Sequence, residues 1–155
     1  MNLRKIVLVA SLVWCGLISA QAQSPAAATS PATTPIWFTI MGDPDEPSVN
    51  TIQVDPVDIE GKPRTKRVRV SRSTQRTSWD GVPYRSYTSA VVFDCEKHKA
   101  RYLQLTYYDQ PNWQGEPSKT VDYSTGTPRW MEFRDVTPNP TQRILTAACT
   151  AAAKR

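Results

Sequence analysis

The sequence lacks the motifs on which most enzymes depend. It has no glycine-rich phosphate loop, no cluster of residues at metal-ligand spacing and no serine on a strand-to-helix elbow. Its single histidine, His98, lies among charged residues in an expected turn, whereas a catalytic thiol needs a histidine that a third group positions. We therefore predict a protein that is not an enzyme and that uses no cofactor or metal ion.

Long apolar runs, glycine and strong charge are also scarce. Apolar residues make up 39% and charged residues 21% of the 155 residues, which excludes a multi-pass membrane protein, a coiled coil and a strongly charged disordered chain. Proline, with 13 residues against 6 glycines, argues against a mainly helical fold because proline interrupts helices. The length allows one compact domain.

The first 22 residues have the pattern of a secretory signal peptide. Arg4 and Lys5 form a positive start, and residues 6–18 form an uncharged apolar segment that is too short to span a bilayer as a mature helix. Small residues follow at the positions that signal peptidase requires, so we predict cleavage after Ala22. Export then leads to the periplasm, the cell surface or the medium.

The exported chain is expected to carry neither a lipid nor a large charge. Cys15 follows Trp14 instead of the small residue that a bacterial lipoprotein site needs. Two of the 19 Lys and Arg lie in the signal peptide, which leaves 17 basic and 14 acidic residues. The resulting net charge of +3 does not indicate specific nucleic-acid binding.

We expect residues 23–35 to form a disordered Pro/Ala/Ser/Thr leader before a domain at 36–155.

Apolar and polar residues alternate with period two over most of this domain, which predicts β-strands. Strands are expected at 52–59, 65–72, 87–95, 100–108, 117–123 and 129–134. Because turn residues separate them by short distances in sequence, antiparallel hairpins are the simplest topology.

Only the C-terminus predicts a helix. Asn139 suits the N-cap and Pro140 the first helical position, and Ile144, Leu145, Ala148 and Cys149 share one face. The expected fold is α+β and mainly β, an antiparallel sheet of about six strands with one C-terminal helix packed on a face. Loss of Cys15 leaves Cys95 and Cys149 in an oxidising compartment, so we predict a disulfide that tethers this helix.

The segment 62–76 is strongly basic and contains no acidic residue. If Val68 and Val70 face the core, Arg67 and Arg69 project from the opposite face, about 7 Å apart at ~3.4 Å per residue. Guanidinium groups at that spacing suit sulfated glycans, phosphates or an acidic protein face. The alternative is that the basic residues only protect an edge strand from aggregation.

Aromatic residues form a second candidate contact region around the turns that follow two of the expected strands. Tryptophan and tyrosine dominate interface hot spots, but such residues also close the open end of a small sheet core. Trp37 and Trp130 lie in strand patterns and are not expected to bind. The candidate binding residues are Arg64, Lys66, Arg67, Arg69, Arg72, Arg76, Trp79, Tyr108 and Trp113.

Several spaced motifs resemble the surface-adhesin protein E family over about residues 36–150. They are Val54-Asp55-Pro56 with Ile59 and Gly61, Gly81-x-Pro-Tyr84-x-Ser86, Phe93-Asp94-Cys95 with Arg101, and then Gly115, Trp130, Pro138 and Cys149. The resemblance implies a small antiparallel sheet whose C-terminal helix is tethered by a disulfide between the two matching cysteines. It also implies a surface protein that binds host matrix or plasma proteins, often as a homodimer. The chain departs from the family in lacking a convincing lipidation cysteine.

We therefore predict an exported binding or adhesion domain that contacts a protein or an anionic glycan through the basic strand and nearby loops. A different class stays open, namely a periplasmic structural or assembly factor that binds another envelope protein through a sheet edge or a helix face. A small hydrolase is the third alternative, and it requires a deep pocket lined by two of the many Asp residues.

Overall fold

The computed structural model describes residues 34–152, with side chains described as far as Thr150. The predicted signal peptide at 1–22 and nearly all of the predicted leader at 23–35 lie outside this range.

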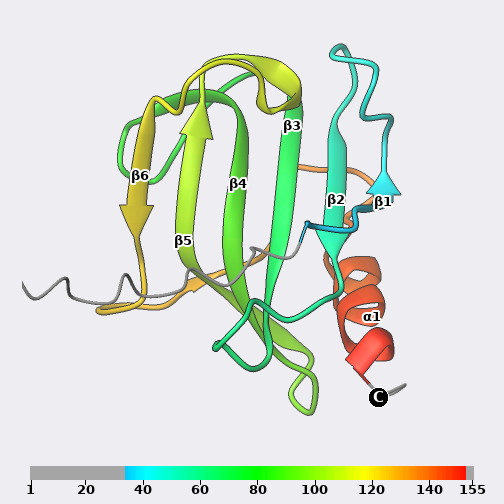
Figure 1. The fold of residues 1–155 in the computed structure, drawn as a ribbon. Coiled ribbons are helices and arrows are strands. Elements are labelled where there is room, and N and C mark those ends of the chain that lie inside the picture. Colours follow the sequence, from blue (N-terminus) through cyan, green and yellow to red (C-terminus); the bar gives the residue numbers. More distant parts are fainter. Residues whose placement is uncertain (1–33, 153–155) are drawn as a thin grey trace, which may run out of the picture. The chain divides into compact units, whose positions relative to one another are not determined.

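Seven strands form one antiparallel sheet in the order β1-β2-β3-β4-β5-β6, and the short β7 also pairs with β5 (Figure 1). Their bounds are β1 Phe38–Met41, β2 Thr51–Asp55, β3 Thr65–Thr77, β4 Pro83–Asp94, β5 Lys99–Tyr108, β6 Lys119–Asp122 and β7 Arg129–Trp130. From β1 to β6 consecutive strands are neighbours, as expected for chain-adjacent antiparallel pairing, whereas β7 pairs with β5 and not with β6. This architecture confirms the predicted mainly-β fold.

Two strands are shorter than their sequence patterns. β2 ends at Asp55 because Pro56 has no N–H to contribute to the ladder. β7 contains two residues only, since the chain leaves the sheet after the Met131 N–H donates to the carbonyl oxygen of Ala100, at 2.9 Å. Phe133 then reaches the core from a loop and not from a strand.

The core lies on one face of the sheet. Val68 and Val70 on β3 are fully buried there, as the alternation predicts. The helix α1, Thr141–Ala152, covers part of this face with Ile144, Leu145 and Ala148. Figure 1 shows α1 near the β1–β2 side of the sheet, so β5 and β6 lie away from it.

The start of α1 and its tether agree with the sequence. Asn139 Oδ1 accepts a hydrogen bond from the Thr141 N–H at 2.9 Å, which is the bond that an N-cap residue makes. Cys95, directly after β4, forms a disulfide with Cys149 on α1 over a sequence separation of 54. The predicted covalent link between sheet and helix is confirmed.

Candidate functional site

The basic strand lies inside the sheet and not at its edge, since β2 and β4 flank β3 on either side. The alternative in which its Lys and Arg protect an edge strand is therefore wrong. Alternation along β3 divides these residues between the two faces of the sheet: Lys66 and Arg72 share the core face with Val68, whereas Arg67 and Arg69 lie on the opposite face.

The two basic residues on the core face are not surface groups, contrary to expectation. The Lys66 side chain is 3% exposed, and its Nζ lies 2.6 Å from Oδ1 of Asp58. The Arg72 side chain is 5% exposed and lies 3.4 Å from Asp135. The sequence pattern contained this information, because residues 66, 68, 70 and 72 must share one face of a strand.

On the opposite face Arg69 forms a cluster with two tryptophans. Its guanidinium carbon lies over both rings, 3.9 Å from the ring centroid of Trp113 and 4.2 Å from that of Trp37. The Arg69 Nε also donates to Oε1 of Gln53 at 2.6 Å. Burial lowers the pKa of Arg69, yet a guanidinium keeps its charge in proteins. We call Arg69, Trp37 and Trp113 the Arg69 cluster.

Trp113 is held by the short 3₁₀ segment η1, Pro111–Trp113, which lies over β3 and β4. Its indole N–H is shared between the carbonyl oxygens of Val70, at 3.2 Å, and Tyr87, at 3.0 Å. A cavity of about 540 Å³ lies beside this segment and is lined by Arg69, Trp113 and the 44–47 loop. The predicted residues Arg69 and Trp113 thus share one site.

The remaining predicted residues occupy several places. Arg67 lies on the face of the Arg69 cluster, with its Nη1 3.3 Å from Oδ2 of Asp55. Arg64 is exposed in the turn before β3, where it has a φ of 59°. Arg76 is half-buried near the far end of β3, and Tyr108 is half-buried at the end of β5, opposite Ser86.

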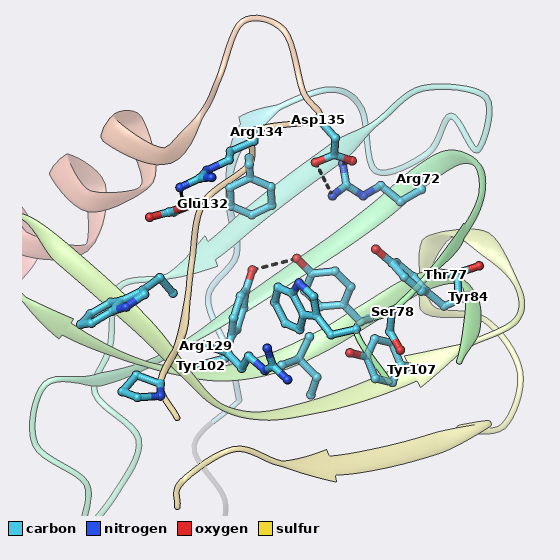
Figure 2. A pocket seen from close by; sticks show the side chains of 16 residues that line it. Arg72, Thr77, Ser78, Tyr84, Tyr102, Tyr107, Arg129, Glu132, Arg134 and Asp135 are labelled. Atoms are coloured by element: carbon cyan, nitrogen blue, oxygen red, sulfur yellow. Dashed lines mark hydrogen bonds and ion pairs between the residues drawn. The ribbon is translucent and has the colours of Figure 1, made fainter. Parts of the chain in front are cut away.

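Trp79 belongs to a different region, a tyrosine-lined cavity of about 500 Å³ on the core face (Figure 2). Trp79 is 54% exposed, and its ring centroid lies 5.8 Å from that of Tyr102 and 5.9 Å from that of Tyr123. Arg129 lies over the Trp79 ring at 5.6 Å. Arg72 lines the same cavity, so two predicted residues meet here, on the other side of the sheet from the Arg69 cluster.

Tyrosine hydroxyls in and around this cavity bond to one another. The Tyr87 and Tyr102 oxygens are 3.0 Å apart and those of Tyr107 and Tyr123 are 3.4 Å apart. Tyr123 donates in turn to Asp80. Burial raises the pKa of Tyr87, Tyr102 and Tyr107, so these hydroxyls stay protonated at neutral pH.

The carboxylates of this cavity do not form an acid–base pair. Glu132 and Asp135 line it, and each is paired with an arginine, Glu132 with Arg134 at 2.6 Å and Asp135 with Arg72. Within residues 34–152, no group of three or more His, Cys, Asp or Glu is placed to hold a metal ion. Over the same range, no helix is long and apolar enough to cross a bilayer.

Sequence reasoning missed several residues of both regions. Trp37 was not expected to take part in a site, yet it contacts Arg69 from just before β1. Arg129 and Tyr102 belong to the tyrosine-lined cavity but carried no sequence signal for binding. Their roles depend on contacts between segments that are far apart in the chain.

The described chain is thus a small antiparallel-sheet domain with a disulfide-tethered C-terminal helix and two arginine–aromatic clusters. The sequence model of the family described as surface-adhesin protein E matches residues 37–150. The chain belongs to this family and is thus an adhesion-type surface protein. Neither a curated protein nor a solved structure was found to match it.

Proposed function

We propose that this adhesin holds an acidic host protein or a sulfated glycan against the sheet face that carries Arg67 and the Arg69 cluster. The observation that carries the proposal is the position of Arg69, a cation held over two indole rings beside an open cavity. Tryptophan and arginine are the residue types that contribute most to protein interfaces.

The chemistry of this face suits an anionic partner. A guanidinium stacked on aromatic rings keeps its outer N–H groups in a fixed plane, which favours two-point binding of a carboxylate or a sulfate. Arg67 lies two residues away on the same face and is paired with Asp55. Exposed Arg64 adds positive charge next to β3. Attraction through such charges weakens with salt.

A heparin column tests the proposal, with a salt gradient applied to wild type and to two variants of equal charge. Arg67→Gln/Arg69→Gln removes two charges from the proposed face, whereas Lys97→Gln/Lys119→Gln removes two from exposed positions elsewhere. We expect the first variant to elute at clearly lower salt than the second. Circular dichroism checks that each variant is folded.

Two results would contradict the proposal. The first is wild-type protein that does not bind heparin at low salt and does not bind immobilised matrix proteins. The second is an equal shift of both variants, which would mean that net charge alone determines binding. Capture of another envelope protein on this same face, without matrix binding, would favour the periplasmic assembly role instead.

A further inference from the structure

The tyrosine-lined cavity has the dimensions of a small-molecule site. Its volume of about 500 Å³ falls within the range of roughly 300–1,000 Å³ that is typical of ligand pockets. Seven of its 16 lining residues are aromatic: Trp79, Tyr84, Tyr87, Tyr102, Tyr107, Trp130 and Phe133. It lies across the sheet from the Arg69 cluster, so the proposed function does not account for it.

Arg72 places at this cavity a buried cation that makes few hydrogen bonds. The side chain is 5% exposed, yet its Nε and Nη1 atoms, both buried, make no hydrogen bond within the described part of the chain. Nε has no partner there, and Nη1 makes only the 3.4 Å ion pair with Asp135. Buried charged donors with so few partners are costly, and native proteins rarely contain them. The guanidinium therefore has unused capacity to bind an anion.

Asp135 satisfies this capacity only weakly. Figure 2 shows it beside Arg72 at one end of the cavity. Both of its oxygens lie 3.4 Å from guanidinium nitrogens, longer than the usual distance of about 2.7–2.9 Å for such a pair, and its side chain is 47% exposed. A ligand carboxylate that approaches from the cavity could take its place.

The remaining charges also favour an anion. Arg134 and Glu132 compensate each other at 2.6 Å. Arg129 lies over the rings of Trp79 and Tyr123, and no carboxylate of the described residues pairs with it. One positive charge in the cavity is left without a counterpart.

The tyrosines complete the site as neutral groups. Burial raises the pKa of Tyr84, Tyr87 and Tyr107, so that each remains a hydroxyl and adds no negative charge at neutral pH. A hydroxyl can donate to a carboxylate or exchange hydrogen bonds with ligand hydroxyls. Their ring faces offer flat contacts for a ring-shaped ligand body.

We propose that this cavity binds a small ligand that consists of a ring and a carboxylate, with the carboxylate on Arg72 and the ring against the tyrosines. This chemistry is shared by sugar acids and aromatic acids. The site lies on the opposite face from Arg67 and the Arg69 cluster. Either proposal can therefore be contradicted without affecting the other.

Calorimetric titration with four probes tests the proposal on the folded domain. Glucuronate and phenylacetate carry the ring and the carboxylate, and glucose and benzyl alcohol are their neutral counterparts. We expect at least one of the two acids to bind saturably, and we expect no binding of the corresponding neutral compound. Binding of glucuronate alone identifies a sugar acid, and binding of phenylacetate alone identifies an aromatic acid.

Three variants link the binding to the cavity. Arg72→Met is expected to weaken it by at least about tenfold, since it removes a charge-assisted hydrogen bond. Asp135→Asn removes the competing carboxylate and is expected to strengthen it. Arg129→Gln removes the cation near the exposed Trp79 and is also expected to weaken binding. This variant tests the proposal even if Arg72→Met does not fold. Lys97→Gln, at an exposed position beside Asp94 and outside the cavity lining, is the control and leaves binding unchanged.

The proposal is overturned if neither acid binds saturably, or if each neutral counterpart binds as well as its acid. It is also overturned if an acid binds but Arg129→Gln and Asp135→Asn leave its affinity unchanged. Chemical shift changes of backbone amides on binding must include residues of β4 and β5 around the cavity. Changes confined to the face of the Arg69 cluster would place the ligand elsewhere.

Discussion

Asp55 and Arg67 stand directly opposite each other on β2 and β3, with Arg67 Nη1 3.3 Å from Asp55 Oδ2. The Asp55 side chain is 1% exposed, and its other oxygen accepts a hydrogen bond from the Val57 N–H at 3.0 Å. The one carboxylate therefore stabilises both the end of β2 and the cation of the proposed binding face.

Replacing Asp55 by Asn is expected to lower the free energy of unfolding by about 1–3 kcal/mol, because it removes a buried charge-assisted pair. Urea denaturation measures the loss. The matched change Glu132→Gln breaks the exposed pair with Arg134 and should cost less than about 1 kcal/mol. Equal effects of the two variants would show that burial does not strengthen the Asp55 pair.

The disulfide between Cys95 and Cys149 is expected to contribute about 4 kcal/mol, since it closes a long loop in the unfolded chain. Replacing both cysteines by serine should lower the urea midpoint accordingly. Thiol titration of the exported protein under denaturing conditions provides the independent check. Two reactive thiols per chain would be incompatible with the linked structure.

Trp113→Phe keeps an aromatic ring beside Arg69 but removes the indole N–H from the carbonyl oxygens of Val70 and Tyr87. We expect a loss of roughly 1 kcal/mol, typical of one hydrogen bond. Trp113→Ala should cost more because the contact with Arg69 is lost as well. Trp130→Phe, at an exposed position, serves as the control in thermal unfolding and is expected to have little effect.

The tyrosines of the cavity predict a loss of stability at alkaline pH. Burial raises the pKa of Tyr84, Tyr87 and Tyr107 above the ordinary value of 10.0, so above that pH the unfolded chain loses phenolic protons that the folded chain retains. The stabilisation is complete below about pH 10 and is lost as the pH rises toward the folded-state values.

Phenolate absorbance and circular dichroism, followed together during an alkaline titration, measure this effect. The buried tyrosines are expected to ionise only as the protein unfolds. Tyr102→Phe removes one of the buried phenols and should reduce the steepness of the loss. Ionisation of all tyrosines near pH 10 in a fully folded protein would contradict the prediction.

Much of the fold could be predicted because it rests on local patterns. Alternating residues located β3 and β5, and Asn139 located the start of α1. The ends of β2 and β7 were less predictable, because the apolar pattern continues past both strands. Pro56 ends β2, and the chain leaves the sheet after Met131 and so ends β7. The candidate sites were predicted in part: Arg69 and Trp113 share a site, whereas Lys66 and Arg72 are buried.

By itself the amino-acid sequence determined which residues share a face of each strand, where the helix begins and that Cys95 pairs with Cys149. It could not determine what covers each face, because burial depends on segments that are distant in the chain. Trp37 and η1 cover Arg69, and the 128–135 segment encloses Arg72 among tyrosines from β4 and β5. Only the tertiary structure therefore decided that one basic strand supplies two different sites, a cation held between indoles on one face and a buried cation in a cavity on the other.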